Sequence, residues 1–489
     1  MRWRGVVWPK KRDALMATPI PKNSAELTAA DAASATGGEI MRDAGRAARG
    51  IVSDTRAIGG GEAFVALRGE THDGHAFLSE ATKRGAAMLV VDRVDGLPDG
   101  PSVVRAKDTL AAWGDLARLH LGRWRNDDKR VVAITGSAGK TTTKQLCAAI
   151  LESVGETWAS PGNLNNLVGV PAVVFALEAR HRFAVIECGM SVRGEIGKLA
   201  RIVEADVAVI TNVSVAHAEG VGGTREDVAR EKGAIYGTAR ACVFDADDPL
   251  AASLAEAHER KIGFGRSERA DYRLLDRVSR GPAGSRVTIE RPCADCPSPN
   301  AREIIELELP FVGEAAAIDL CAALAAAEIA CGAIGQDALD AAMKRVTNVA
   351  GRAGIVDLGD VLVIDDTYNA NPASMRAALS ILSDLAGPRR RVAVLGEMKE
   401  LGASARAEHT ALGDALAGAK VALAIGCGGL ASATIQRARE LGVEAVDCAN
   451  VEDAAKEAVS RVRPGDVVLV KGSRSVGAEA VVARLGGAR

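Results

Sequence analysis

The feature that most constrains this chain is the segment VVAITGSAGKTTTK at residues 131–144. Its first half is an apolar, β-branched run, typical of a buried parallel strand, and its second half is a glycine turn followed by a helix start. The backbone N–H groups of such a turn form a concave anion site, which the helix dipole strengthens. The segment therefore predicts a phosphate-binding loop in which Lys140 reaches the terminal phosphates and the Thr141 hydroxyl is available to Mg²⁺.

The spacing within this loop differs from the general phosphate-loop pattern G-x-x-x-x-G-K-[ST]. Ile134 stands where that pattern has its first glycine, and the chain carries the shorter G-x-x-G-K-T-T. The shorter form favours a few families of ATP-dependent ligases over nucleotide hydrolases in general. The alternative, a glycine turn that precedes Lys-Thr by chance, is disfavoured by the strand before it. The residues expected to hold the nucleotide at this loop are Gly136, Ser137, Gly139, Lys140, Thr141 and Thr142.

Composition excludes several classes of protein. The 489 residues are too many for one hydrophobic core and indicate two to four domains. Sixty-one basic and 63 acidic side chains give a net charge of −2, so we expect neither nucleic-acid nor membrane binding. Nine scattered cysteines and the lack of a secretory signal predict a cytoplasmic protein. Residues 1–15 are interpreted as an N-terminal extension of the first domain.

No stretch of about 18 uncharged apolar residues is present, so no membrane span is expected. A zinc site at Cys293 and Cys296 is disfavoured because the sequence lacks a second C-x-x-C pair to complete four ligands.

Three segments of the chain differ in their pattern of strand-like and helical runs. They predict an α/β fold with three domains. We place these domains at residues 1–107, 108–349 and 350–489. In the third segment strands alternate with amphipathic helical patterns, which predicts a doubly wound, Rossmann-like parallel sheet. The middle segment combines the phosphate-loop strand with further alternating elements, and residues 265–310 are interpreted as a loop or small hairpin insert because they lack a helical period.

Ligands of open α/β sheets collect beyond the carboxyl ends of the strands. In the middle segment the phosphate loop ends one strand, Glu187 ends a second, and Asn212 ends a third, with His217 five residues later. Thr141 and Glu187 supply the oxygen ligands that a hard cation requires. For His217 a metal-ligand role and a structural role are about equally supported.

Two further polar segments of the middle domain are less specific. The run GNLNNLVGVP at 162–171 offers amide groups that suit phosphate or carboxylate oxygens, but an Asn/Gly turn before a helix is a serious alternative when the run is taken alone. Lys232 lies in the charged run TREDVAREKGAIY, for which a solvated helix face is the default interpretation.

The third segment places polar residues after its own strands. Asp365 or Asp366 could take ribose hydroxyls or a cation, and Pro372 suits the first turn of a helix. Lys471 and Arg474 suit a carboxylate or a phosphate. Together these positions predict a second polar rim opposite the phosphate loop, with catalysis at a domain interface.

With these residues considered together, the chain resembles the Mur ligases, the ATP-dependent amide-forming enzymes that build the peptide of the bacterial cell-wall precursor. The resemblance covers about Thr36 to Leu485. The segments that carry it are SDTRAIGGGEAFVALRGETHDGHAF (53–77), GSAGKTTTK (136–144), GNLNNLVGVP (162–171), ECGMSVRGEI (187–196), ITNVSVAH (210–217), DDTYNANPASM (365–375), LGEMKELG (395–402) and KGSR (471–474). The DDTYNANP and LGEMKELG segments, and the lack of a D-[ND]-P-R motif, favour the branch that joins D-alanyl-D-alanine to UDP-N-acetylmuramoyl-tripeptide through an acyl phosphate.

The resemblance implies an N-terminal domain for the UDP moiety, a central domain for ATP and a Rossmann-like C-terminal domain in a cytoplasmic, monomeric enzyme. It also implies roles for individual positions, which fall into three groups. The uridine diphosphate would lie near Ser53, Asp54 and Arg56, supported by Asp73 and His75. A first Mg²⁺ would be held by Thr141 and Glu187, and His217 would serve a second Mg²⁺. ATP would be held by Lys140, Asn166, Arg352, Asp366, Tyr368, Asn369 and Asn371. Lys232 matches a position that some Mur ligases carbamylate, and its state is left open; Lys471 and Arg474 would contact substrate.

One departure from the family pattern concerns the base of the nucleotide. The family has G-x-H-N-x-x-N before an Ala-rich helix, where an Asn contacts adenine. In this chain the run is GEAAAID at 313–319, so alanines replace the His and the first Asn, and Asp319 replaces the second. We therefore expect adenine to be held differently.

Three alternatives stay open at this point. The first is another ligase of the same superfamily, such as folylpolyglutamate synthetase. The second is a nucleotide-dependent switch, which should carry the longer phosphate loop. The third is a non-catalytic binding protein, which the presence of Lys140, Glu187 and His217 disfavours.

Overall fold

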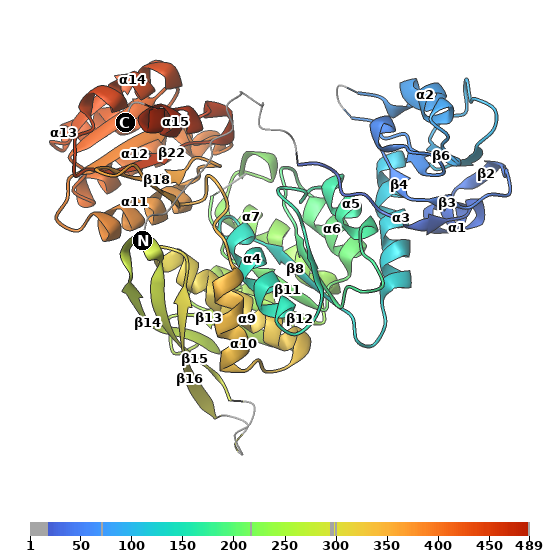
Figure 1. The fold of residues 1–489 in the computed structure, drawn as a ribbon, viewed down its shortest axis with the longest axis horizontal. Coiled ribbons are helices and arrows are strands. Elements are labelled where there is room, and N and C mark those ends of the chain that lie inside the picture. Colours follow the sequence, from blue (N-terminus) through green and yellow to red (C-terminus); the bar gives the residue numbers. More distant parts are fainter. Residues whose placement is uncertain (1–17, 70–71, 216–217, 294–297, 299–300, 488–489) are drawn as a thin grey trace. The chain divides into compact units, whose positions relative to one another are not determined.

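The computed structural model describes residues 18–69, 72–215, 218–293, 298 and 301–487, and the chain divides into two compact units. The first unit contains the described residues up to His120 together with Ser160–Leu164 and Val168–Ala176, and the second contains the remainder. The described strands form three sheets, of five, nine and six strands, and a small two-stranded pair; Figure 1 shows how the helices and strands follow one another along the chain. The expected class, α/β with three domains, is confirmed, and the boundaries at 107/108 and 349/350 stay predictions.

The first unit is built on the five-stranded sheet, in the order β2-β7-β6-β5-β4. β4, β5, β6 and β7 run parallel, and β2 is antiparallel at the edge. All four residues of β6 are buried, which agrees with its unbroken apolar sequence. The elements are β1 (Glu26–Leu27), α1 (Ala29–Thr36), β2 (Glu39–Arg42), β3 (Ala48–Arg49), β4 (Ile51–Val52), η1 (Thr55–Ala57), β5 (Ala63–Val65), η2 (Gly74–Phe77), α2 (Leu78–Lys83), β6 (Met88–Val91), β7 (Ser102–Arg105), most of α3 (Thr109–Trp124) and α5 (Gly169–Phe175).

The second unit begins with the nine-stranded sheet, in the order β16-β15-β14-β13-β12-β11-β8-β10-β9. β8, which leads into the phosphate loop, lies between β10 and β11 and is parallel to both, so the three strand ends predicted to meet are neighbours. The elements are β8 (Arg130–Thr135), α4 (Lys140–Glu152), β9 (Thr157–Ala159), β10 (Phe183–Glu187), α6 (Glu195–Val203), β11 (Val207–Ile210), η3 (Ala218–Gly220), α7 (Arg225–Gly233), η4 (Ala234–Thr238), β12 (Ala241–Asp245), α8 (Pro249–Ala255), β13 (Lys261–Gly265), β14 (Tyr272–Ser279), η5 (Gly281–Ala283), β15 (Ser285–Pro292), β16 (Arg302–Leu309), α9 (Glu314–Cys331) and α10 (Gln336–Arg345).

The interpretation of residues 265–310 as a loop or small hairpin was wrong. Three strands of eight residues each, β14, β15 and β16, continue the sheet, and β15 is antiparallel to both neighbours. Their residues alternate between buried and more exposed positions, as expected for strands with one face on a core. The Gly/Pro sequence at 281–284 is the turn between β14 and β15 and not the centre of an irregular insert.

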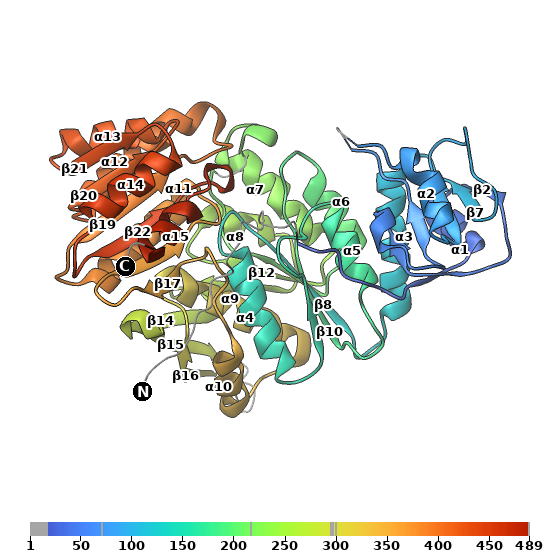
Figure 2. The same cartoon turned by 45° about the horizontal axis from the view of Figure 1, so that its top comes forward.

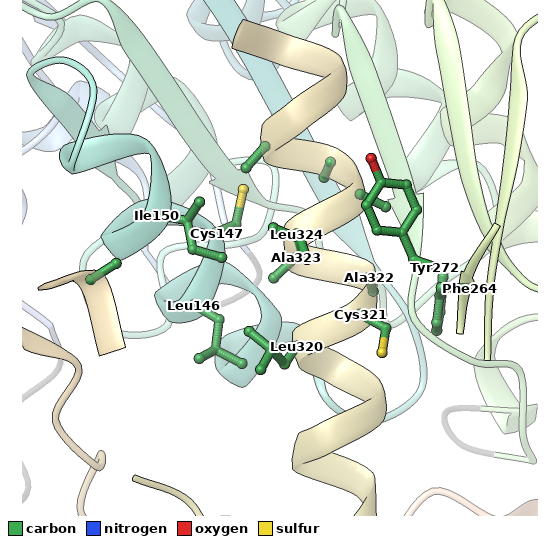
Figure 3. Close-up of a cluster of buried hydrophobic side chains, with 14 of the residues drawn as sticks. Leu146, Cys147, Ile150, Phe264, Tyr272, Leu320, Cys321, Ala322, Ala323 and Leu324 are labelled. Carbon is green, nitrogen blue, oxygen red and sulfur yellow. The ribbon is translucent and has the colours of Figure 1, made fainter. Parts of the chain in front are cut away.

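The core of this part lies where α4, α9 and α10 cover one face of the sheet (Figures 1 and 2). α9 is almost entirely apolar because it is buried on two sides, against α4 and against the strands. Figure 3 shows α4 side chains on one side of α9 and strand side chains on the other; the labelled residues are Leu146, Cys147, Ile150, Phe264, Tyr272, Leu320, Cys321, Ala322, Ala323 and Leu324. This packing fixes the position of α9 against α4.

The six-stranded sheet has the order β17-β18-β22-β19-β20-β21 and is parallel except for β17. Alternate residues of its strands enter two apolar clusters, one with α11 and α12 and one with α14 and α15. This is the predicted doubly wound sheet. The elements are β17 (Gly354–Asp357), β18 (Leu362–Asp366), α11 (Pro372–Ala386), β19 (Arg391–Gly396), η6 (Gly402–Ser404), α12 (Ala405–Gly418), β20 (Leu423–Cys427), α13 (Ala431–Glu440), β21 (Glu444–Cys448), α14 (Val451–Arg461), β22 (Val467–Lys471), η7 (Arg474–Val476) and α15 (Glu479–Gly487).

None of the helices in the described ranges combines the length and the apolar character that a membrane crossing requires.

Candidate active site

The turn between β8 and α4 depends on two glycines. Gly136 has φ +152° and Gly139 has φ +79°, both in the region that L side chains rarely adopt. A Cβ at Gly136 would overlap the Thr211 hydroxyl, and a Cβ at Gly139 would overlap the carboxyl group of Asp319. Both positions therefore require glycine for backbone conformation and for space.

The residues after β11 hold the turn in place. The Asn212 side chain accepts a hydrogen bond from the Ala138 N–H at 3.0 Å and donates one to the Ala138 carbonyl at 3.0 Å. The Thr211 hydroxyl donates to the same carbonyl at 2.5 Å. Ser137 adds a reciprocal pair with Ser214, through its hydroxyl, at 3.1 and 3.0 Å. Protein groups alone therefore hold the phosphate loop in place at Ser137 and Ala138.

Two lysines converge on one carbonyl oxygen of this loop. Lys140 Nζ donates to the Gly136 carbonyl at 2.8 Å, and Lys232 Nζ donates to it at 3.1 Å. Burial, followed by the nearby charge of Lys140, lowers the pKa of Lys232 well below its ordinary value, and Glu231 opposes this shift. The expectation that Lys232 lies on a solvated face was wrong, because packing of α7 leaves its side chain only 1% exposed.

Glu187, at the end of β10, collects the donors around the first turns of α4. Its Oε2 accepts from the Thr141 hydroxyl at 2.9 Å and lies 3.1 Å from Lys144 Nζ, and its Oε1 accepts from Asn165 at 2.9 Å. Burial alone would raise the pKa of Glu187. The charges of Lys144, Lys140 and Arg352 and the Asn165 hydrogen bond outweigh that effect and lower the pKa, so the carboxylate is held ionised.

These oxygens suit a hard cation such as Mg²⁺. Thr141 and Glu187 present a hydroxyl and a carboxylate side by side, which is the donor chemistry that Mg²⁺ prefers. Within the described ranges no three His, Cys, Asp or Glu side chains form a self-contained metal cluster. One hydroxyl and one carboxylate leave other coordination positions for phosphate oxygens and water, which are common ligands of Mg²⁺.

The segment after β18 contacts the phosphate loop. Asn371 caps α11 through its side-chain oxygen, and its Nδ2 donates to the Ser137 carbonyl at 3.2 Å. Asp366, the last residue of β18, accepts from Lys471 at 2.6 Å and from the Ala353 N–H at 3.1 Å. Lys471 is only 2% exposed, and its ammonium also donates to the Asn369 carbonyl.

Two arginines lie over the ring of Tyr368. The guanidinium of Arg352 is 4.1 Å from the ring centroid and that of Arg474 is 5.3 Å from it, both within the range of a cation–π interaction. The positive charge of Arg352 also acts on Lys140 and Glu187, lowering the pKa of each. Arg352 therefore belongs electrostatically to the phosphate-loop site.

The five site residues predicted in the first unit form two local groups. Asp54, just after Ser53, caps η1 and pairs with the guanidinium of Arg56 at 2.6 Å; this hydrogen bond is the main cause that lowers the pKa of Asp54. Buried His75 accepts from the Asp92 N–H at Nε2, so its Nδ1–H donates to Asp73 at 2.8 Å. The His75 N–H is the first cause that lowers the pKa of Asp73 to about 2.

The structure brings together most of the positions predicted around the phosphate loop, while His217 lies outside the described residues. Asn166 is exposed, and it is the neighbouring Asn165 that bonds Glu187. Thr142 is half-buried on the first turn of α4. Lys144 was not among the predicted site residues, although its spacing of four from Lys140 places both on one helix face. Thr211 was not predicted either, and no local signal in the sequence marks it.

Comparisons with known proteins agree with this architecture. Three family models match: the Mur ligase family catalytic domain at 48–115, the Mur ligase middle domain at 134–327, and the Mur ligase glutamate ligase domain at 351–474. The UDP-N-acetylmuramoyl-tripeptide--D-alanyl-D-alanine ligase of Bacillus subtilis is 31% identical over 444 residues, covering 88% of this chain and 92% of that protein.

Solved structures are similar over nearly the full length. A crystal structure of MurF from Acinetobacter baumannii superposes with a TM-score of 0.83 at 29% identity, covering 94% of this chain and 99% of that one. MurF ligase from Thermotoga maritima in complex with ADP gives a TM-score of 0.77 at 26% identity, covering 90% and 97%. This chain belongs to the Mur ligase family. Within that family it is an ATP-dependent ligase of the MurF type.

Proposed function

We propose that this MurF-type ligase joins D-alanyl-D-alanine to UDP-N-acetylmuramoyl-tripeptide in peptidoglycan precursor synthesis, using ATP and an acyl phosphate. The observation that supports this most is the convergence of Lys140, Glu187 and Arg352 on a loop that Asn371 also contacts. A carboxylate oxygen is a poor leaving group, so an amine does not displace it at neutral pH. Transfer of the γ-phosphoryl group converts it into a good one.

The reaction would proceed in two displacements. A carboxylate oxygen of the tripeptide attacks the γ-phosphorus, the bond to the bridging oxygen breaks, and ADP leaves. The D-alanyl-D-alanine amine then attacks the acyl carbon, the bond from that carbon to the phosphate oxygen breaks, and the amine proton passes to solvent or phosphate. Both steps need charge neutralisation and exclusion of water more than a protein nucleophile.

The residues near the phosphate loop suit the first displacement. Lys140 would bind the β- and γ-phosphates. Its ammonium donates a hydrogen bond to the neutral Gly136 carbonyl of the loop, and phosphate oxygens can replace that carbonyl as the acceptor. Arg352 would neutralise charge that develops on the γ-phosphoryl group. Thr141 and Glu187 would hold Mg²⁺, which when bound polarises the phosphoryl oxygens.

The proposal extends to the other predicted site residues. Ser53, Asp54 and Arg56 would contact the uridine diphosphate, with Asp73 and His75 supporting the turn beside them. In the third domain Asp366, Tyr368 and Asn369 would line the nucleotide, and Arg474 would contact substrate, whereas Lys471 would act by holding Asp366. We further propose a monomer in the cytoplasm, where buried thiols such as that of Cys147 stay reduced.

The test is phosphate release from ATP with the UDP-linked tripeptide and D-alanyl-D-alanine supplied singly and together. We expect release that depends on both acceptors. Lys140→Ala should abolish ligation and leave the far-UV circular dichroism unchanged. Lys198 is exposed on α6, so Lys198→Ala should leave ligation intact. Equal ATP hydrolysis without acceptors would instead indicate a nucleotide switch, and ligation retained in Lys140→Ala would contradict the role given to this lysine.

A further inference from the structure

Asp319 lies on the second turn of α9, directly behind the phosphate loop. Its carboxyl group occupies the space that a Cβ of Gly139 would take, with Oδ2 at 2.8 Å and Cγ at 2.9 Å from that ideal position. The side chain is buried, 7% exposed, because α9 packs tightly along α4. A titratable group therefore sits against the backbone that begins α4, at the position where the family pattern G-x-H-N-x-x-N has its second Asn.

The surroundings of Asp319 disfavour its charged form. Burial is the main cause that raises the pKa of Asp319, to about 8, and the carboxyl of Asp245 at the end of β12 adds to this rise. The Thr143 side chain on α4 opposes it. Burial is the main cause that raises the pKa of Cys321, two residues further along α9. The charge of Arg266, which pairs with Glu314 of α9, opposes this rise, and a charge on Asp319 adds to it. At neutral pH the Asp319 carboxyl is thus mostly protonated.

A charge on Asp319 would compete with the nucleotide. The N-terminus of α4 carries a partial positive charge and unpaired N–H groups, which is the reason that it attracts phosphate. An ionised carboxylate behind Gly139 would draw on the same positive end and would repel a phosphate in front of it, in surroundings where charges are weakly screened. A neutral carboxyl fills the same space without that repulsion.

We propose that Asp319 is a positioning residue of the nucleotide site, and that the phosphate loop accepts a nucleoside polyphosphate only while the Asp319 carboxyl is uncharged. The proposal rests on the nucleotide binding that the proposed function requires. It makes the affinity for nucleotide dependent on one proton that is bound some distance from the reacting atoms.

The size of the effect follows from the fraction of protein that is competent to bind. With the pKa of Asp319 at about 8, the affinity for nucleotide should be about twofold weaker at pH 8 and about tenfold weaker at pH 9 than at a pH where the carboxyl is fully protonated. Lys140 and Lys232 also lose protons more easily than ordinary lysines and would weaken binding at high pH. The ratio between a variant and the wild type is therefore the quantity to measure, since it cancels their contribution.

The experiment is a calorimetric titration of the full-length protein with ADP and Mg²⁺ between pH 6.5 and 9. Asp319→Asn keeps the shape of the side chain and removes the proton equilibrium. We expect the affinity of this variant, relative to the wild type, to rise about tenfold between pH 7 and pH 9. Asp337→Asn, at an exposed position on α10, is the matched control and should give a constant ratio.

A constant ratio for Asp319→Asn over this range would overturn the proposal. If that variant does not fold, Asp245→Asn decides instead, because removal of the Asp245 charge should lower the pKa of Asp319 and move the loss of affinity to lower pH. An unmoved profile in Asp245→Asn would likewise overturn it. Failure of the proposed function would be distinct, since it would show as phosphate release that needs no acceptor, whatever the pH.

Discussion

Replacement of Gly136 by alanine should disable nucleotide binding through two separable effects. The first is backbone strain, because residue 136 has φ +152°, which alanine adopts only at a cost. The second is displacement of Thr211, because the new Cβ would overlap its hydroxyl oxygen. That hydroxyl donates to the Ala138 carbonyl at 2.5 Å, so the clash also breaks one of the bonds that pin the loop.

The two effects add up to a large loss of affinity. A residue held in a rarely populated backbone region costs about 1–3 kcal/mol, and loss of a hydrogen bond costs about 0.5–1.5 kcal/mol. Their sum, roughly 1.5–4.5 kcal/mol, corresponds to roughly 12- to 1,600-fold weaker binding if the loop must regain this geometry to hold phosphate. Calorimetric titration with ADP and Mg²⁺ measures this directly.

A second substitution separates the clash from the strain. Thr211→Ala alone should weaken ADP binding a few-fold, because it removes one hydrogen bond. In the Gly136→Ala background it should instead improve binding, because it removes the overlapping oxygen. Gly122→Ala on α3, where a Cβ meets nothing within 4 Å, should leave ADP affinity unchanged. If Thr211→Ala weakens binding equally in both backgrounds, the clash is not the cause and the reasoning is refuted.

Two further predictions concern carboxyl groups whose pKa the structure lowers. Lys144→Met removes the ammonium 3.1 Å from Glu187, so the pKa of Glu187 should rise and the acid limb of the pH–rate profile of ligation should move to higher pH; an unmoved limb would argue against a catalytic need for ionised Glu187. Asp73, with its pKa lowered to about 2, stabilises the fold above its unfolded value of about 3.9, and this stability is lost as pH falls toward 2. Thermal unfolding of Asp73→Asn should therefore depend less on pH between about 4 and 2 than that of the wild type, and parallel curves would contradict the assignment.

Much of the active site could be predicted because strand ends can be recognised in sequence. An unbroken apolar run followed by polar residues marks the carboxyl end of a buried parallel strand, and this pattern identified Glu187 and the phosphate loop itself. Sheet order was the further condition, and β8 lies between β10 and β11 as that prediction required. The same logic identified Asp366 and Lys471, the last residues of β18 and β22, which are also neighbouring strands.

Other features depend on tertiary packing and leave no local signal. Lys232 lies in a charged run, and only the packing of α7 buries it against the Gly136 carbonyl. Asp319 is 180 residues from Gly139 in sequence, so neither residue alone indicates that they touch. In β14–β16 an alternating pattern was present, but the Gly/Pro turn between two of the strands obscured it.

The charges around the phosphate loop explain why the turn is so densely pinned. Lys140, Lys144 and Arg352 surround one carboxylate, that of Glu187, and so the site carries more positive than negative charge. Of these three cations, Lys144 lies within ion-pair distance of that carboxylate. Lys140 bonds a neutral carbonyl, and Arg352 lies on an aromatic ring with its buried Nε lacking a hydrogen-bond partner among the described residues.

Like charges repel more strongly where water is excluded, and that repulsion would tend to open the loop. The side chains of Thr211 and Asn212 counter it with three hydrogen bonds to one residue, Ala138. The loop therefore has its binding conformation before a polyanion arrives, and Lys140 and Arg352 make only weak interactions that the polyanion can replace. Little protein reorganisation then opposes its binding. Folding therefore supplies the free energy that holds the cations close together, and binding of the nucleotide relieves their repulsion. For this reason the two glycines and the residues at the end of β11 matter as much for nucleotide binding as Lys140 does.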